Sequence, residues 1–394
     1  MIDTAPSTTA RMRNPIGNPS LKIIFIVTRA DTMAGAQTHV VEMAGALLEE
    51  GHQAHVLCGR GERLPDVLSS RGIPFTRVGA LKRSLHPLHD LHALLSLTLH
   101  LRKAAPDLVS LHSSKAGILG RLACRMLGIP ALFTAHGWAF AEGVGTRSRH
   151  VYALIERRLQ RSSAQIICVS EADRRLAIKE GFDGTNMVTV HNGRHDRGEP
   201  RSSGRDAGGP MRLVMVGRLD RQKDHPTLFR ALSFLDGWVL SLVGEGPDRV
   251  ALQALTHECG IADRVDFVGE TDDVAGVLAS SDAFALISNW EGFPRSTLEA
   301  MRASLPVIVS DVGGSREAVK EGVTGLVVAR GDIDGVRGAI SGLIDDPEGA
   351  RLMGKRGRTL FEERFTFDTM YRRTRTVQRT VLAASGPGSS VIRS

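Results

Sequence analysis

One stretch of the chain decides its fold, and it reads Trp290-Glu291-Gly292-Phe293-Pro294-Arg295-Ser296-Thr297-Leu298-Glu299-Ala300-Met301. It follows the apolar run 283–287, which is typical of a buried strand. Gly292 and Pro294 then interrupt the chain. Ser296, with Glu299 three residues later, predicts that a helix begins at this point. A strand, a sharp turn and a helix N-terminus in this order indicate a parallel α/β sheet.

The predicted helix N-terminus is suited to a phosphate group. Its unpaired N–H groups and its positive dipole end attract anions. Glu291 and Glu299 lie on either side of the turn, where each could accept hydrogen bonds from sugar hydroxyls. The alternative is simpler, because Ser296-x-x-Glu299 is also an ordinary capping box and Glu291 could be a solvated carboxylate.

The composition is that of an ordinary globular protein long enough for two domains. The chain has 394 residues, of which 42% are hydrophobic and 24% charged. A net charge of +7 suits anionic ligands or an anionic membrane surface. Aromatic residues make up only 5% and no nucleic-acid-reading motif occurs, so we expect no DNA or RNA partner.

The cysteines and the termini favour the cytoplasm. The four cysteines are far apart, which predicts neither a metal site nor a disulfide framework: Cys58, Cys124, Cys168 and Cys259. No apolar run reaches the ~18 residues that span a bilayer. The N-terminus is polar and lacks the apolar core of a signal peptide.

The apolar runs follow one α/β pattern twice. The predicted strands are 21–27, 54–58, 107–112, 131–134 and 165–169, then 213–216, 239–243, 265–268, 283–287, 306–310 and 325–328. Helical patterns separate them, so each half is predicted to form a parallel sheet covered on both faces. The expected fold class is α/β, with two Rossmann-like doubly wound domains facing across a cleft. The first turn nevertheless lacks the Gly-x-Gly-x-x-Gly dinucleotide fingerprint.

Composition also predicts the domain boundaries. We expect a disordered tail over 1–20, an N-terminal acceptor-side domain over 21–193, a polar Gly/Pro/Ser linker over 194–210, a C-terminal nucleotide-sugar-binding domain over 211–365, a basic helix over 366–384 that crosses back to the first domain, and a flexible tail over 385–394.

Residues suited to phosphate follow two predicted strands of the second domain. Arg218 and Lys223 come after the strand 213–216, and an Arg fork with a Lys point charge is a usual partner set for adjacent phosphates. Gly244 and Gly246 follow the next strand and allow close backbone approach. Arg218 and Lys223 could instead be solvated surface charges, and Gly244 and Gly246 could form an ordinary turn.

The first domain offers a second set of candidates at its strand ends. His136 follows the strand 131–134 and could donate to a sugar hydroxyl or to a developing charge. Gly35 lies in the first loop, where backbone N–H groups could approach a phosphate. Lys115 follows the strand 107–112. Most of the fourteen histidines have no such position, so His136 is favoured by its place alone.

Taken together in this order, the motifs resemble those of a family 4 glycosyltransferase of the GT-B fold, of the bacterial capsule and exopolysaccharide type. The resemblance covers roughly residues 21–380. Its carriers are Glu291-Gly-Phe-Pro with Glu299, Val216-Gly-Arg-Leu with Lys223, Val243-Gly-Glu-Gly-Pro, Asp311-Val-Gly-Gly, Val169-Ser-Glu and Thr134-Ala-His-Gly-Trp. Two departures are small: Ala34-Gly35-Ala36 where many members have two glycines, and Ser304 where the family usually has glycine.

The resemblance implies a retaining transfer of a sugar from a nucleotide-diphosphate sugar, with a UDP-sugar expected, and no required metal or other cofactor. The acceptor would be a saccharide or a polyprenyl-diphosphate-linked sugar in cell-surface polysaccharide synthesis. Arg218 and Lys223 match the positions that hold the donor diphosphate, and Glu299 matches the ribose ligand. Arg218, Lys223 and the helix N-terminus at Ser296 would stabilise the negative charge of the leaving diphosphate.

The remaining roles follow in the same way. Glu291, with the backbone of Gly292, Phe293 and Pro294 after it, matches the group that holds the donor sugar. His136 matches the histidine near the reacting sugar. Gly35 matches the glycine loop near the phosphates, with Gly244 and Gly246 as a nucleotide loop. An acceptor-side role for Lys115 is a guess from similar Ser-Lys-Ala-Gly stretches.

Other functions stay open at this point. A nucleotide-sugar epimerase or hydrolase on the same fold would need no acceptor. A non-catalytic nucleotide-sugar-binding scaffold is a third possibility, and the presence of Glu291, Glu299, Arg218 and Lys223 argues against it. A two-carboxylate glycosidase is not favoured, because Glu299 is better placed as a cap or ribose ligand.

The segment 87–104 raises the question of membrane contact. It is rich in leucine and is flanked by cationic residues, namely Lys82, Arg83, Arg102 and Lys103. It could be an amphipathic helix packed on the sheet, or a peripheral attachment to the anionic cytoplasmic face of a membrane.

Overall fold

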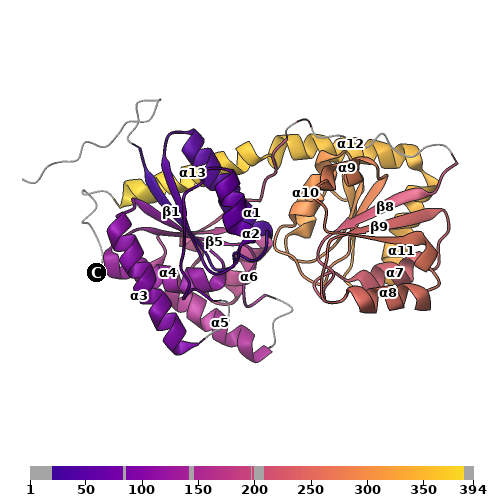
Figure 1. The fold of residues 1–394 in the computed structure, drawn as a ribbon. Helices are drawn as coiled ribbons and strands as arrows, with labels where there is room; N and C mark the ends of the chain where they lie inside the picture. Colours follow the sequence, from indigo (N-terminus) through magenta and orange to yellow (C-terminus); the bar gives the residue numbers. More distant parts are fainter. Residues whose placement is uncertain (1–19, 83–85, 142–145, 197, 199–207, 386–394) are drawn as a thin grey trace, which may run out of the picture. The chain divides into compact units, whose positions relative to one another are not determined.

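The computed structural model describes residues 20–82, 86–141, 146–196, 198 and 208–385. The chain divides into two compact units. The first comprises residues 1–136, 155–167 and 376–394, and the second comprises residues 137–154 and 168–375. Each unit is built on a predominantly parallel sheet (Figure 1).

The first sheet has seven strands in the order β3-β2-β1-β4-β5-β6-β7. They are β1 (Lys22–Val27), β2 (Gln53–Cys58), β3 (Phe75–Arg77), β4 (Leu108–His112), β5 (Ala131–Ala135), β6 (Gln165–Cys168) and β7 (Met187–Thr189). The helices between them are α1 (Gly35–Glu49), α2 (Arg63–Ser70), α3 (Pro87–Ala104), α4 (Ser114–Leu127), α5 (Thr146–Leu159) and α6 (Glu171–Lys179). The pairs β1–β2, β1–β4, β2–β3 and β4–β5 are parallel.

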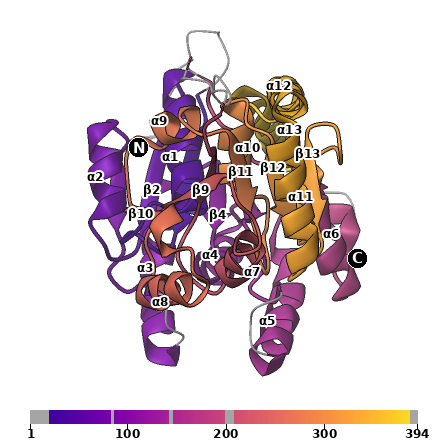
Figure 2. The same cartoon turned by 90° about the vertical axis from the view of Figure 1, so that its right-hand side faces the viewer.

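The second sheet has six strands in the order β10-β9-β8-β11-β12-β13. They are β8 (Met211–Val216), β9 (Trp238–Val243), β10 (Val265–Gly269), β11 (Ala283–Leu286), β12 (Val307–Ser310) and β13 (Gly325–Val328). The helices that follow in the sequence are α7 (His225–Leu232), α8 (Arg249–Glu258), α9 (Val274–Ala279), α10 (Arg295–Arg302), α11 (Ile333–Asp345), α12 (Pro347–Arg364) and α13 (Phe367–Ala384). The last of them, α13, begins in the second unit and continues into residues 376–394 of the first. In Figure 1, α7, α8 and α11 lie below this sheet, and α9, α10 and α12 lie above it; Figure 2 turns the same unit toward the viewer.

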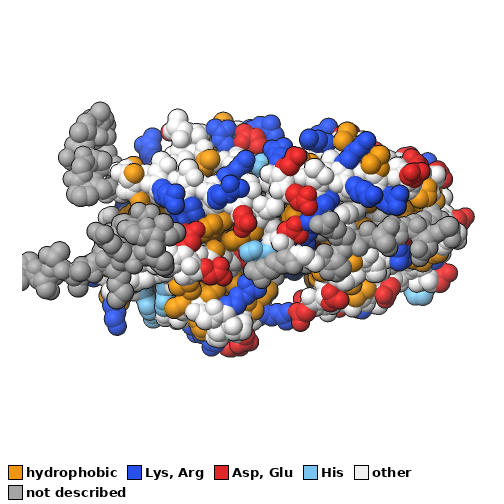
Figure 3. All heavy atoms as spheres, turned by 90° about the horizontal axis from the view of Figure 1, so that it is seen from above, with side chains coloured by type: hydrophobic (Ala, Val, Ile, Leu, Met, Phe, Trp, Pro, Cys, Tyr) orange, Lys and Arg blue, Asp and Glu red, His pale blue; other side chains and the backbone are white. Residues whose placement is uncertain are grey.

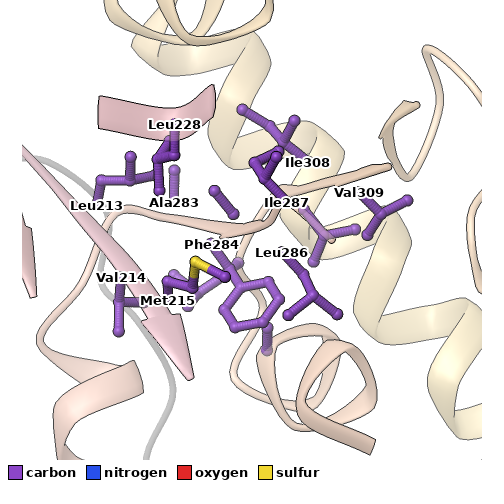
Figure 4. Packing of buried hydrophobic residues seen from close by; sticks show 14 of the residues in the cluster. Leu213, Val214, Met215, Leu228, Ala283, Phe284, Leu286, Ile287, Ile308 and Val309 are labelled. Carbon is purple, nitrogen blue, oxygen red and sulfur yellow. The ribbon is translucent and has the colours of Figure 1, made fainter. Parts of the chain in front are cut away.

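The central strand β11 shows why the second sheet forms. Its residues Ala283 to Leu286 are all apolar and fully buried. A strand covered by helices on both faces cannot alternate polar and apolar side chains, so it is a continuous apolar run. Figure 4 shows Phe284 and Ile287 packed with Met215 of β8 and Ile308 of β12. Each such side chain contributes roughly 1.5–3 kcal/mol on burial.

The predicted α/β class with two parallel sheets is confirmed, and so is every predicted strand. Two short strands were not predicted from the sequence: β3 and β7, with three residues each. Both lie at edges of the first sheet, where a half-exposed strand needs no apolar run.

The exposed side of α12 is basic. Arg351, Lys355 and Arg356 are exposed on it, while Leu360 and Phe361 are buried in the core. Figure 3 shows Lys and Arg side chains gathered on the face that carries this helix. None of the described helices is long and apolar enough to cross a membrane.

Candidate functional site

The site is built on the carboxyl ends of three neighbouring strands of the second sheet, β8, β11 and β12. Main-chain hydrogen bonds join the segment after β8 to the segment after β11. Asp224 N–H donates to the Ile287 carbonyl at 2.9 Å, and Asn289 N–H donates to the Gln222 carbonyl at 2.8 Å. Side chains from the two segments are therefore held at fixed positions, at the edge of the sheet where such folds bind ligands.

Lys223 and Glu291 meet at this edge. The Lys223 ammonium forms an ion pair with the Glu291 carboxylate, and their side chains are only 10% and 6% exposed. Ser288 Oγ donates to the same carboxylate at 2.8 Å, and Gln222 Nε2 donates to it at 3.3 Å. The sequence thus placed Lys223 and Glu291 in one site, but it gave no indication that they bind each other.

Two glycines after β12 fix the position of the Glu291 loop. A Cβ on Gly313 would lie 1.8 Å from the Glu291 carbonyl oxygen, and Gly313 has a φ of +50°. Gly314 N–H donates to the Gly292 carbonyl at 2.8 Å, and a Cβ there would lie 2.2 Å from that oxygen. Glycine is needed here because the backbone of one loop packs directly on the backbone of the other.

The predicted cap of α10 is wrong. The helix begins at Arg295 with Pro294 as its N-cap residue, so Ser296 is the second residue of the helix and makes no side-chain cap. Pro294 has no N–H to satisfy, and its ψ of 123° directs the chain into the helix. The first turn contains no acidic residue, so the positive end of the helix is not neutralised from within it.

Glu299 is not part of a capping box either. Its carboxylate forms an ion pair with Arg194 at 2.9 Å, and the two side chains are 15% and 21% exposed. Arg194 is itself held by the backbone, since its N–H donates to the Phe365 carbonyl at 3.0 Å. The partner of Glu299 therefore comes from a part of the chain more than one hundred residues away.

Arg218 differs from Lys223 in its exposure. Its guanidinium contacts the Asp220 carboxylate at 3.1 Å, and its side chain is 55% exposed. It lies two residues beyond the end of β8. An exposed guanidinium at a strand end can reorient toward an anion at little cost in desolvation.

The glycines of the predicted nucleotide loop have a packing role. A Cβ on Gly244 would lie 2.1 Å from the Gly217 carbonyl oxygen, and a Cβ on Gly246 would lie 2.1 Å from that of Leu219. Gly244 also has a φ of +134°. Contact between the two loops is enough to require glycine at both positions, with or without a ligand.

In the first unit, His136 belongs to a hydrogen-bonded chain. His112 Nδ1 and His136 Nε2 lie 2.9 Å apart, and His112 Nε2 lies 2.9 Å from Ser110 Oγ. Burial, and then the neighbouring His136, lower the pKa of His112 well below its ordinary value. His112 is therefore neutral at physiological pH, and it orients the ring of His136.

Gly35 and Lys115, the two other candidates of the first unit, lie at a helix start and in an ion pair between helices. Gly35 is the first residue of α1, whose first turn contains no acidic side chain. Lys115, on α4, forms an ion pair with Asp90 of α3 at 2.5 Å and is only 7% exposed. This pair joins the two helices and gives Lys115 a structural role of its own.

Several residues at the site were not predicted. Gln222 and Ser288 adjoin predicted residues in the sequence, so their position in the two loops was the available signal. His112 had the signal of its place at the end of the predicted strand 107–112, but no role was assigned to it, and Arg194 had no signal at all. The contacts that make both residues relevant, Arg194 with Glu299 and His112 with His136, are created by the fold.

These features define a class of protein. A likeness to solved structures supports the fold: the HepE protein of Anabaena in complex with UDP has a TM-score of 0.80 at 19% identity, over 91% of this chain and all of that one. Sucrose-phosphate synthase from Thermosynechococcus elongatus has a TM-score of 0.81 at 20% identity, over 92% of this chain and all of that one. The fold is the two-domain GT-B fold of glycosyltransferases.

The family follows from the sequence comparisons. Residues 34–193 match the model of the glycosyl transferase 4-like domain, and residues 196–360 match that of glycosyl transferases group 1. An Escherichia coli UDP-Gal:alpha-D-GlcNAc-diphosphoundecaprenol alpha-1,3-galactosyltransferase is 30% identical over 332 residues, which cover 80% of this chain and 86% of that protein. The O-antigen biosynthesis glycosyltransferase WbnH of the same species is 28% identical, over 83% of this chain and 91% of that one. The chain belongs to the family 4 glycosyltransferases and is an enzyme of that class.

Proposed function

We propose that the enzyme transfers a sugar from a UDP-sugar to a saccharide or polyprenyl-diphosphate-linked acceptor in cell-surface polysaccharide synthesis, with retention of the anomeric configuration. The observation that carries the proposal is the buried pair of Lys223 and Glu291 beside the N-terminus of α10. A cation, a carboxylate and a positive helix end within one small region suit a ligand that combines a diphosphate with sugar hydroxyls. The name of the galactosyltransferase relative supports the donor and acceptor classes, and that of WbnH supports polysaccharide synthesis.

The proposed roles in the second unit follow from this chemistry. Arg218, Lys223 and the first-turn N–H groups near Ser296 bind the diphosphate and stabilise the charge that grows on it as the bond to the sugar breaks. Glu299 accepts from the ribose hydroxyls. Glu291 and the backbone after it, at Gly292, Phe293 and Pro294, hold the donor sugar.

The remaining roles complete the proposal. In the first unit His136 is proposed to contact the reacting sugar, and Gly35 to present N–H groups to phosphate. The loop with Gly244 and Gly246 is proposed to border the nucleotide. The reaction is proposed to need no metal, because cationic side chains and N–H groups serve the diphosphate.

Arg218 is the best position for a test. Lys223→Ala would leave the buried Glu291 without its charged partner and would cost several kcal/mol in stability. Arg218 is exposed, so Arg218→Ala removes a phosphate ligand without that cost. The loss of a charge-assisted hydrogen bond is about 1.5–3 kcal/mol, so we expect UDP and UDP-sugar to bind about 10- to 150-fold more weakly. Arg337→Ala, which removes an exposed cation from α11, is the matched control.

Binding should be measured by calorimetry, and transfer by release of UDP with and without a lipid-linked acceptor, in the presence of EDTA. Unchanged donor affinity in Arg218→Ala would refute the assignment of the diphosphate. Turnover that needs no acceptor would favour an epimerase or hydrolase, and binding without turnover would favour a scaffold. An inverted anomeric configuration in the product would contradict retention.

We also propose that α3 attaches the enzyme peripherally to the cytoplasmic face of a membrane. Four leucines at spacings of three and four residues lie on one exposed side of this helix: Leu88, Leu91, Leu95 and Leu99, at 73%, 55%, 53% and 65% exposed. The opposite side buries Ala93, Leu97 and Leu101. Both interpretations of this segment therefore have support, since the helix packs on the protein with one side and presents leucine on the other.

Positively charged side chains near these four leucines support an anionic surface as the partner. Arg102 and Lys103 lie in the last turn of α3 and are exposed. Lys82 precedes the helix, and Arg83 lies outside the described residues. The free, mostly buried cysteines are compatible with a reducing compartment.

Flotation with liposomes of anionic and of neutral lipids tests the attachment. Each leucine side chain removed from the interface costs about 1.5 kcal/mol, so Leu91→Gln with Leu95→Gln should weaken binding about 100-fold. Leu352→Gln, at an exposed leucine of α12, is the control. Equal flotation of wild type and the double variant would refute the proposal.

A further inference from the structure

Three histidines from distant parts of the sequence meet in the first unit. They are His39 on α1, His112 at the end of β4, and His136 just after β5. One ring nitrogen of each lies within 4.8 Å of those of the other two. The ring centroid of His39 is 5.2 Å from that of His112 and 4.9 Å from that of His136. Within the described part of the chain, no other group of histidine, cysteine and carboxylate side chains is gathered closely enough to hold a metal.

The surroundings of His112 match those of a metal ligand. Its Nε2 lies 2.9 Å from Ser110 Oγ, which can accept the Nε2 proton. In that tautomer the Nδ1 lone pair is directed toward His136. Metal-binding histidines regularly donate their other N–H to an oxygen, which fixes the tautomer and the ring. Phe25 stacks on His112 at 5.8 Å and further restricts the ring.

We propose that His39, His112 and His136 form a binding site for Zn²⁺ or a similar divalent transition metal. Imidazole nitrogen suits such metals, whereas Mg²⁺ and Ca²⁺ prefer oxygen ligands, which this cluster lacks. Three histidines leave a fourth coordination position for water. The metal would replace the proton that His112 and His136 share at 2.9 Å.

The geometry needs adjustment at two places, because the cluster's ring nitrogens lie up to 4.8 Å apart. With Zn–N bonds of about 2.0–2.1 Å, two ligand nitrogens in a tetrahedron lie about 3.4 Å apart. The His112–His136 pair must therefore open by about half an ångström. His39 and His112 are buried, at 4% and 1% exposed, and His136 is less so. His136 is thus the ligand with most room to move, and the nitrogen of His39 must close by at most about 1.4 Å to complete the set.

The consequence for activity rests on the proposed function. If His136 contacts the donor sugar, a bound metal withdraws it from that role. Zn²⁺ should then inhibit transfer and EDTA should restore it. The site is therefore regulatory, and it is distinct from any metal requirement of the reaction.

The test uses the full chain after treatment with EDTA and then gel filtration. Co²⁺ is added, and the visible absorption typical of tetrahedral Co²⁺ is followed, then its displacement by Zn²⁺. We expect one ion per chain, with at least 100-fold weaker binding in His39→Ala and in His136→Ala. Ser110→Ala should weaken binding about 10- to 100-fold, because it removes only the outer hydrogen bond. His257→Ala, at an exposed histidine of α8, should bind as wild type does.

Circular dichroism and the melting temperature show whether each variant folds, and His39→Asn replaces His39→Ala if the latter does not. The proposal is overturned if wild type binds no Co²⁺ or Zn²⁺ stoichiometrically, or if the His39 and His136 variants bind it equally well. UDP binding is measured separately in EDTA, so failure of the proposed function leaves the metal result standing. Stoichiometric Zn²⁺ binding without inhibition of transfer would overturn the regulatory part.

Discussion

Replacing Asp173 by asparagine should stabilise the protein at alkaline pH and much less at acid pH. Asp173 lies in the first turn of α6 and is 4% exposed. Its Oδ2 finds no hydrogen-bond partner among the described residues. Burial raises the pKa of this carboxyl from 3.8 to about 7, and the nearby Glu317 carboxylate adds to the increase while Ser170 partly offsets it.

The sign follows from the two pKa values. The folded state holds this proton more tightly than the unfolded state does. The contribution of protonated Asp173 to the free energy of unfolding is therefore fully present below about pH 3.8, and it is lost as the pH rises through about 7. Between pH 5 and pH 7 the loss spans two pH units, or about 2.7 kcal/mol at 1.36 kcal/mol each. Asparagine keeps the shape and has no charge to desolvate, so this loss is absent in Asp173→Asn.

Thermal unfolding at pH 5 and pH 8 measures the effect. One kcal/mol corresponds to roughly 2–4 °C for a unit of this size. The advantage of the variant over wild type should therefore be roughly 5–10 °C larger at pH 8 than at pH 5. Asp334→Asn, which removes an exposed carboxylate from α11, is the control and should show no such difference. An equal change of melting temperature at both pH values would refute the reasoning.

Three further predictions concern stability and are checked by urea unfolding. Ser304 has a φ of +62°, so Ser304→Gly should stabilise the protein by about 1 kcal/mol, and a loss of stability would contradict the strain. Gly244→Ala would place a Cβ 2.1 Å from the Gly217 carbonyl oxygen and should cost about 2 kcal/mol or more; a neutral result would show that the loops can separate. Glu156→Gln would leave the fully buried Arg121 without its charged partner and should cost about 3–5 kcal/mol, whereas a cost below about 1 kcal/mol would mean that water reaches the pair.

The central strands could be predicted because a strand that is buried on both faces is an uninterrupted run of apolar residues in the sequence. A run such as 283–287 has no polar position, so it indicates a covered parallel strand without any knowledge of its neighbours. The edge strands β3 and β7 left no such mark, because each has three residues and partial exposure. Strands could therefore be predicted from the sequence where they are buried on both faces, and they were missed where they are short and partly exposed.

The start of α10 shows where local rules fail. Ser296 with Glu299 has the spacing of a capping box, but Pro294 already directs the chain into the helix. Glu299 is then drawn to Arg194, whose position depends on the backbone near Phe365. A capping rule considers four consecutive residues, and the competing partner lies far outside them.

By itself, the sequence determined the α/β class, the family and the set of residues at the strand ends, because hydrophobic periodicity and motif order are local properties of the chain. Only the tertiary structure decided which of those residues bind each other. Lys223 pairs with Glu291, Gly313 packs on the loop that carries Glu291, and His39 joins His112 and His136. Parallel strands bring their carboxyl ends to one edge of a sheet whatever their separation in sequence. A linear pattern lacks this information, namely which residues lie close together in space.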